Sequence, residues 1–185
     1  MDAKSKQEMM SYYDGRAEEY DDIYLGRGPA IPDPEAYKVD AARISQMVAA
    51  FGRGHLIDIG CGTGFWLPFY ARNCTRITLN DRSEKMLLQC KNRVRELPAL
   101  EGRCRFVQGD FFDLAFADLF DSALVGFLIS HLCLEQEEAF FTKLKTILRP
   151  NAELMLIDSA WSSRRSQFRS REGTQVRALR DGRVF

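Results

Sequence analysis

The stretch HLIDIGCGTGFW, His55–Trp66, decides the fold. In it an apolar run reaches an acid, and three glycines then alternate with a cysteine and a threonine. A short apolar run of this kind is typical of a buried strand, and the residues from Phe65 onward predict a helix. Glycine at such a turn lets the backbone bend sharply and lets a ligand approach it closely. The stretch therefore predicts a ligand site at the end of a strand.

Strand and helix patterns alternate along the rest of the chain. After the glycine turn the sequence predicts strands at 76–80, 105–109, 120–128 and 153–158, and helices at 65–72, 83–96 and 135–148. Before the turn it predicts helices at 4–20 and 34–50, and Asp33 would cap the second of these. Alternating elements with apolar strands predict an α/β fold with a doubly wound, mostly parallel sheet. In such sheets, ligands bind beyond the carboxyl ends of the strands.

Composition limits the partners and the compartment. The chain has 185 residues, enough for one domain. Its formal net charge is zero, so the overall charge does not indicate a nucleic-acid partner. Its five cysteines are scattered and show no metal-type spacing, so we expect no metal and a reduced, cytoplasmic location. The polar N-terminus lacks the pattern of a signal peptide, and no apolar run is long enough for a membrane span.

The spacing of the glycine turn differs from that of common nucleotide loops. It lacks the Gly-Lys-Ser/Thr ending of a phosphate-binding loop, and Phe65 stands where a dinucleotide fingerprint has its third glycine. Asp58, before the turn, would repel a pyrophosphate and attract a cationic ligand. The turn therefore predicts a positively charged ligand rather than a polyanionic one.

Two further acids end the neighbouring strands. Asp81 can accept hydrogen bonds from both hydroxyls of a ribose. Asp110 can accept one from an exocyclic amine while Phe111 packs on a base. A ribose, a base and a cation together describe S-adenosylmethionine better than a nicotinamide dinucleotide.

Several segments together resemble the class I S-adenosylmethionine-dependent methyltransferases. The matching segments are LIDIGCGTG (the first motif), LNDRSEKML (the ribose-binding segment), VQGDFFDL (the adenine-contacting motif), FDSALVGFLISHL (the fourth-strand motif that forms the floor of the site) and LKTILRPNAELMLID (the stretch through the fifth strand). In the last segment Asn151-Ala152 replaces the usual Gly-Gly, which should alter a turn and leave cofactor binding alone. The resemblance covers about Tyr12 to Asp158.

This resemblance implies a Rossmann-like methyltransferase fold and an enzyme that uses S-adenosylmethionine and releases S-adenosylhomocysteine. The cofactor-binding residues that we expect on this basis are Tyr13, Tyr20, Asp58, Gly60, Cys61, Gly62, Thr63, Gly64, Asp81, Arg82, Met86, Asp110, Phe111, Gly126 and Phe127. Among them Met86 would lie near the adenine, and Tyr13 or Tyr20 would cover the cofactor.

The resemblance also divides the chain into three parts. Residues 1–50 would form an N-terminal helical lid, 51–160 the cofactor-binding α/β core, and 161–185 a basic tail with the start of a sixth strand. The family's sheet normally has two further strands, so we expect either a truncated chain or a partner on the exposed sheet edge. The tail is rich in arginine and could be a solvated surface or a site for an anionic group.

The expected reaction is methyl transfer to a small-molecule acceptor by in-line displacement at the sulfonium methyl. His131, just past the fourth strand, is the candidate general base, although it could instead cap the next helix or pack under the lid. Phe127 and Trp161 are candidates to line the acceptor pocket. The alternatives are a cofactor-binding module without catalysis, a nucleic-acid or protein methyltransferase, and a nicotinamide oxidoreductase. A homodimer is possible, and neither the acceptor nor the methylated atom follows from the sequence.

Overall fold

A computed structural model describes residues 3–27 and 33–158. The basic tail, Trp161 and the expected sixth strand lie outside these residues. The helices are α1 (Ala3–Arg16), α2 (Pro34–Ala49), α3 (Leu67–Tyr70), α4 (Glu84–Arg95) and α5 (Leu134–Ile147), and the short 3-10 helices are η1 (Tyr20–Asp22), η2 (Ala71–Asn73), η3 (Pro98–Leu100) and η4 (Ile129–His131). The strands are β1 (Gly54–Ile59), β2 (Cys74–Asp81), β3 (Cys104–Gln108), β4 (Phe120–Gly126) and β5 (Leu148–Ile157).

These strands form one five-stranded sheet in the order β3-β2-β1-β4-β5. Every pair in it is parallel, with Asp58 of β1 opposite Leu79 of β2 and Leu124 of β4. The chain moves outward from β1 to β2 and β3, then returns to the other side of β1 with β4. The predicted doubly wound parallel sheet is therefore confirmed, with its switch point between β1 and β4.

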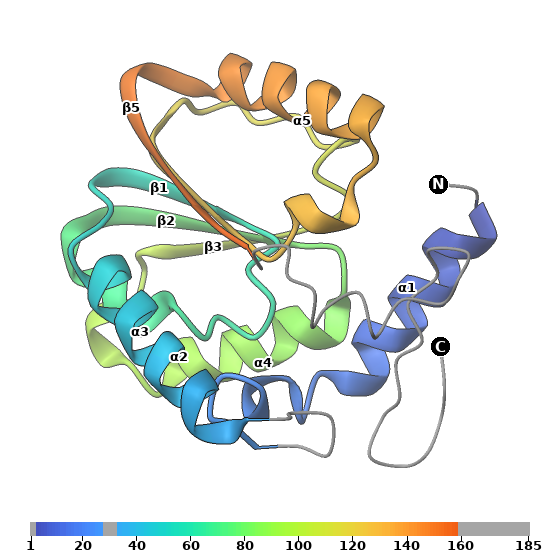
Figure 1. Cartoon of the computed structure of the whole chain (residues 1–185). Helices are drawn as coiled ribbons and strands as arrows, with labels where there is room; N and C mark the ends of the chain where they lie inside the picture. Colours follow the sequence, from blue (N-terminus) through green and yellow to red (C-terminus); the bar gives the residue numbers. More distant parts are fainter. Residues whose placement is uncertain (1–2, 28–32, 159–185) are drawn as a thin grey trace.

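Helices cover both faces of the sheet, as Figure 1 shows: α2, α3 and α4 lie on one side and α5 on the other. Alternate residues of β1 face opposite sides, so Leu56 joins the core under the first set while Ile57 and Ile59 join the core under α5. On the α5 side Phe140 and Phe111 pack with their ring centroids 5.0 Å apart. The two cores fix the strand ends on which the site is built.

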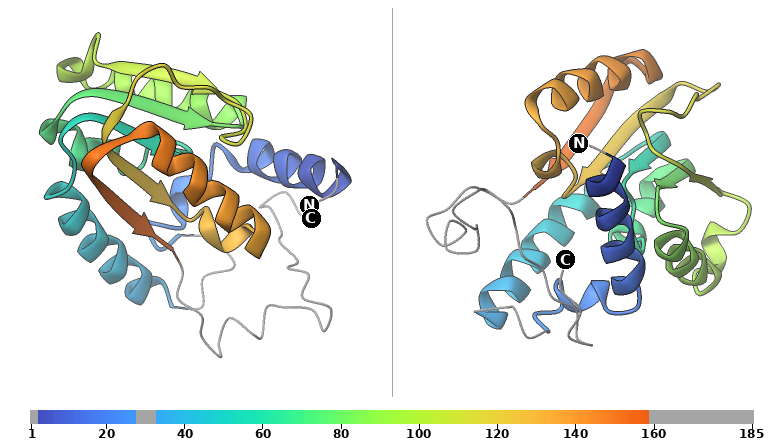
Figure 2. Two further views of the ribbon diagram at one scale, coloured as in Figure 1. Left: turned by 90° about the horizontal axis from the view of Figure 1, so that it is seen from above. Right: turned by 90° about the vertical axis from the view of Figure 1, so that its right-hand side faces the viewer.

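The N-terminal helix ends earlier than the predicted helix over 4–20. It stops at Arg16, and the chain turns through η1, whose Asp21 side chain accepts a hydrogen bond from Thr63 of the glycine turn. In the left view of Figure 2, α1 extends away from the sheet and from the helices that flank it. The chain turns here instead of continuing the helix, and the turn brings Tyr20 back toward the sheet.

The second helix begins as predicted. The Asp33 carboxylate accepts a hydrogen bond from the Ala36 amide, 3.1 Å long, and Pro34 takes the first helical position. Its apolar residues are only partly buried, since Val48 is fully buried while Met47 is 63% exposed. The helix therefore packs on the sheet mainly through its C-terminal end.

Three other element boundaries differ from the predictions. The helix after the glycine turn is shorter, α3 followed by η2, and Pro68 stands at its N-terminus. β4 ends at Gly126 because Phe127 adopts a left-handed backbone, φ 54°. β5 begins at Leu148, before Pro150, and passes through an irregular register at Asn151, whose φ is 62°. Asparagine tolerates this left-handed conformation, which explains how it can stand where glycine is usual.

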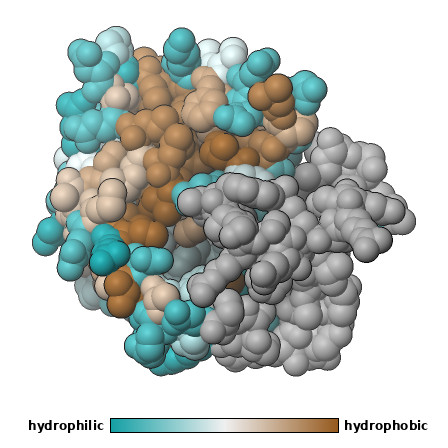
Figure 3. Space-filling model, viewed as in Figure 1, coloured by the Kyte–Doolittle hydropathy of each residue, from teal (hydrophilic) through white to brown (hydrophobic). Residues whose placement is uncertain are grey.

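β5 is one of the two edge strands of the sheet in the described part of the chain, and β3 is the other. On β5, Leu154 and Leu156 are exposed, and apolar side chains gather over the face of the molecule shown in Figure 3.

None of the helices in residues 3–27 and 33–158 combines the length and the apolar character that a bilayer crossing needs.

Candidate functional site

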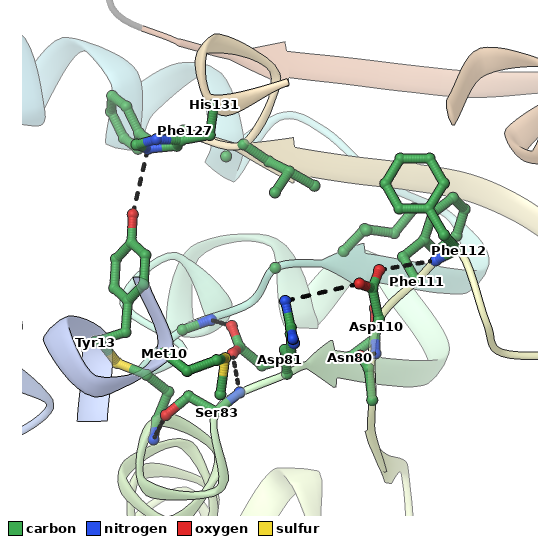
Figure 4. Close-up of a pocket in the computed structure, with 18 of the residues that line it drawn as sticks. Met10, Tyr13, Asn80, Asp81, Ser83, Asp110, Phe111, Phe112, Phe127 and His131 are labelled. Carbon is green, nitrogen blue, oxygen red and sulfur yellow. Dashed lines mark hydrogen bonds and ion pairs between the residues drawn. The ribbon is translucent and has the colours of Figure 1, made fainter. Parts of the chain in front are cut away.

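A cavity of about 1040 Å³, open mouth included, lies at the carboxyl ends of β1, β2, β3 and β4, with α1 and η1 on its other side. Figure 4 shows the side chains that converge on it. The expected site residues that line it are Tyr13, Tyr20, Gly60, Gly62, Asp81, Arg82, Met86, Asp110, Phe111, Gly126, Phe127 and His131. The structure thus brings twelve of the sixteen together, from segments more than a hundred positions apart.

The glycine turn forms the floor of the cavity beside β1. The amides of Gly60 and Cys61 both donate to the Asn80 carbonyl oxygen at 2.9 Å, which bends the chain away from the sheet. Gly60, Gly62 and Gly64 all have positive φ. A Cβ on Gly62 would lie 3.8 Å from the Tyr20 ring, so the missing side chain leaves space between the turn and η1.

Asp81 is held in a fixed orientation at the end of β2. One carboxylate oxygen accepts from the Gly62 amide and the other from the Ser83 amide, both at 2.8 Å. Burial raises the pKa of Asp81, while these backbone amides act in the opposite direction. A carboxylate oriented in this way has lone pairs left for hydroxyl donors in the cavity.

Asp110 lies on the same wall of the cavity, just past the end of β3. It accepts a hydrogen bond from the Phe112 amide at 3.1 Å, and Arg82 approaches its other oxygen at 3.8 Å. Phe111 is 5% exposed and packs on the core under α5. Asp110 and Phe111 both line the cavity.

Asp58 lies behind the glycine turn and is not among the residues that line the cavity. It is 3% exposed, and the Tyr70 hydroxyl donates to it at 2.7 Å. Burial raises the pKa of Asp58 to about 7, while the Tyr70 hydrogen bond lowers it and the Asp81 charge raises it further. The physical reason for this placement is strand alternation: Ile59 faces the cavity, and Asp58 faces α3.

The opposite wall of the cavity joins the N-terminal helix to the segment after β4. The Tyr13 hydroxyl and His131 Nε2 are 3.2 Å apart, with the rings edge to face (Figure 4). Tyr20 also lines the cavity, and the ring centroid of Tyr24 lies 5.9 Å from that of Tyr20 and 5.7 Å from that of Phe127. Burial raises the pKa of Tyr20 well above its ordinary value, so its hydroxyl stays neutral.

Three other expected residues do not line the cavity. Cys61 is buried in the core of the α4 side, and a Cβ on Gly64 would lie 2.7 Å from Cys90 Sγ, so both support the turn from behind. The Thr63 hydroxyl donates to Asp21 on the far side of the turn. The wall residues that the sequence analysis missed are Met10, Ile59, Asn80, Ser83, Gly109, Phe112, Leu128, Leu132 and Gln136. Their one shared signal is position, since most lie within two residues of an expected site residue.

Comparison with known proteins agrees with this geometry. A family model described as a methyltransferase domain matches residues 56–151. The chain belongs to the methyltransferase domain family. The predicted resemblance to the S-adenosylmethionine-dependent methyltransferases is thereby confirmed.

The individual relatives have low sequence identity to this chain. A phosphatidylethanolamine N-methyltransferase of Cereibacter sphaeroides is 28% identical over 106 residues, which are 57% of this chain and 50% of that protein. This methyltransferase domain chain therefore spans about half the length of that curated relative.

Solved structures share the fold. A complex titled DhpI-SAM-HEP superimposes with a TM-score of 0.77 at 24% identity, covering 100% of this chain and 81% of that one. The N-methyltransferase NodS of Bradyrhizobium japonicum, in complex with S-adenosylhomocysteine, gives 0.62 at 18% identity, covering 80% and 71%. At these identities the likeness shows a common fold for the methyltransferase domain.

Proposed function

We propose that this chain binds S-adenosylmethionine in the cavity and transfers its methyl group to a small-molecule acceptor. The observation that carries the proposal is the convergence of the glycine turn, Asp81 and Asp110 on one wall, opposite the Tyr13–His131 pair. The shared family and the ligands named in the neighbouring structures support the same reading.

The residues of the cavity fit a sulfonium nucleoside. Asp81 would accept the ribose hydroxyls, because its orientation is already set by the Gly62 and Ser83 amides. Asp110 would accept from the adenine amine, with Phe111 against the ring and Met86 below it. The methionine end would lie along Gly60 and Gly62, where no side chain blocks the backbone. Asp58 would act on the methionine end only by long-range electrostatic attraction, when it is ionised above its raised pKa of about 7.

S-adenosylmethionine supplies a methyl carbon that is already electrophilic because it is bonded to a sulfonium. The protein must then align the acceptor, exclude water and accept a proton. His131 would take the proton from the acceptor at Nε2, the atom that Tyr13 now contacts. The segment from α1 to η1 would serve as the lid, because Tyr13 and Tyr20 close one side of the cavity.

An amine is the acceptor type that we propose first. Two of the relatives named above are N-methyltransferases, one of phosphatidylethanolamine and one titled NodS. A small or amphipathic amine would suit the wall formed by Phe127, Leu128 and Leu132, which carries no fixed charge. In this reading His131 keeps the attacking nitrogen unprotonated.

Calorimetry with S-adenosylmethionine, S-adenosylhomocysteine and NADH tests the cofactor assignment. We expect both sulfur ligands to bind and NADH not to bind; the reverse would exclude the proposal. Methyl transfer from labelled cofactor to a panel of small amines, alcohols, carboxylates and thiols then tests the activity. Binding without transfer to any acceptor would favour a module that holds the cofactor without catalysis.

A further inference from the structure

Three side chains meet behind the glycine turn, on the side away from the cofactor cavity. Asp21 comes from η1, Thr63 from the glycine turn and Arg93 from α4. The Thr63 hydroxyl donates to Asp21 Oδ1 at 2.5 Å, Arg93 Nη2 forms an ion pair with Asp21 Oδ2, and Arg93 Nε donates to the Thr63 carbonyl at 3.1 Å. Each member of this Asp21–Thr63–Arg93 triad thus contacts both of the others.

The triad is adjacent to the aromatic cover of the cavity. Asp21 directly follows Tyr20, whose ring lies against the open face of Gly62 and lines the cavity. Thr63 directly follows Gly62. The consecutive residues Tyr20 and Asp21 therefore place a ring and an acid on opposite sides of the turn. Gly62 and Thr63 face them, with the bare backbone of Gly62 against the ring and the Thr63 hydroxyl against the acid.

We propose that the Asp21–Thr63–Arg93 triad positions Tyr20 over the glycine turn and thereby sets how long the bound cofactor is retained. The proposal rests on the proposed function for its ligand. Asp21, Thr63 and Arg93 are positioning residues in this account, since none of them lines the cavity.

The environment of the triad makes it strong enough for this task. The Asp21 and Arg93 side chains are each 27% exposed, and Thr63 is buried. Charge-assisted hydrogen bonds of this kind are about twice as strong as neutral ones, and partial burial reduces screening by salt. A second tie, from the Ser83 hydroxyl to Asp14 at 2.5 Å, holds the preceding helix but does not act on Tyr20 directly.

Hydrogen exchange of the cofactor-free protein tests the positioning step without any ligand. The amides of Asp22, Leu25 and Gly26 are hydrogen-bonded within the turn that follows Tyr20. In Asp21→Asn and Arg93→Gln, we expect these amides to exchange at least about tenfold faster than in the wild type, since a charge-assisted bond is lost. Glu18→Gln, a neighbouring acid outside the triad, is the matched control and should leave them unchanged. Unchanged exchange in both triad variants would overturn the proposal.

Release of S-adenosylhomocysteine tests the functional step. We expect Asp21→Asn, Arg93→Gln and Thr63→Val each to speed dissociation about tenfold. The double variant Asp21→Asn with Arg93→Gln should speed release by less than the product of the two single effects, because both single variants remove the Asp21–Arg93 ion pair. Additive effects, or wild-type release rates in all three, would refute the triad's role. If the wild type itself binds no S-adenosylhomocysteine, the proposed function fails. The hydrogen-exchange experiment still tests the positioning step, because it uses no ligand.

Discussion

At the scale of single residues, Asp81 is the acid that we propose for the ribose of the cofactor. Its two backbone hydrogen bonds hold the carboxylate still before any ligand arrives. We predict that Asp81→Ala weakens binding of S-adenosylmethionine by more than about 1 kcal/mol, because a charge-assisted two-hydroxyl contact is lost. Calorimetry measures this, with the exposed Asp113→Ala as control. An unchanged affinity in a folded variant would remove the ribose assignment.

Substitutions at Tyr13 and His131 should separate effects on cofactor binding from effects on turnover. We predict that His131→Ala leaves cofactor affinity nearly intact and lowers kcat about 10²-fold or more, the range that a general base supplies. Tyr13→Phe keeps the ring and removes the hydroxyl that lies 3.2 Å from the imidazole, so it should lower kcat by a smaller factor. Steady-state kinetics with a saturating cofactor measures both. Full activity in His131→Ala would show that this histidine only packs beneath α1.

At the scale of elements, the fit between the glycine turn and α4 sets the geometry of the site. Gly64 and Gly102 have nearly the same φ, +72° and +73°, but a Cβ on Gly64 would lie 2.7 Å from Cys90 Sγ, whereas one on Gly102 would meet nothing within 4 Å. We predict that Gly102→Ala costs about 1–2 kcal/mol from backbone strain alone. Gly64→Ala should cost about 1–3 kcal/mol more, because it also forces α4 away.

Urea unfolding measures this pair of variants. Removing the opposing sulfur with Cys90→Ala should recover part of the extra cost in the Gly64→Ala background. If Gly64→Ala and Gly102→Ala destabilise equally, the close packing of the turn on α4 contributes nothing.

Element boundaries show where the sequence was and was not sufficient. The succession of strands and helices along the chain and the Asp33 cap followed from local patterns, because apolar runs and capping side chains act over a few residues. The end of α1 at Arg16 did not, because it depends on a contact between Asp21 and Thr63, which are far apart in sequence. The early start of β5 likewise depends on pairing with β4.

At the scale of the whole molecule, the topology explains which site residues could be predicted. Parallel strands end at one edge of the sheet, so Asp81, Asp110 and the glycine turn were bound to meet once the strand order was known. Facing direction was harder to predict, since Asp58 and Thr63 stand among site residues and yet face away from the cavity. The Tyr13–His131 contact joins residues 118 positions apart, which no local pattern encodes.

Asp58 also makes stability of the cofactor-free protein depend on pH. Burial raises its pKa from 3.8 to about 7, so between these values the native state keeps a proton that the unfolded chain releases. Its contribution to stability is therefore fully present below the ordinary pKa of aspartate and is lost as pH rises through about 7. The expected slope from this group is at most about 1.4 kcal/mol per pH unit within that window. Asp81, whose pKa is also raised, adds a slope of the same sign.

Asp58→Asn tests this, because asparagine resembles the neutral acid and can still accept the Tyr70 hydrogen bond. We predict that the variant gains on the wild type in free energy of unfolding as pH rises from 5 to 8, because the native wild type must hold a proton on Asp58 that the unfolded chain releases. Urea unfolding at the two pH values measures the difference, with the exposed Asp40→Asn on α2 as control. A variant that is less stable by the same amount at both pH values would mean that Asp58 is ionised in the folded protein throughout, held by Tyr70 rather than neutralised by burial.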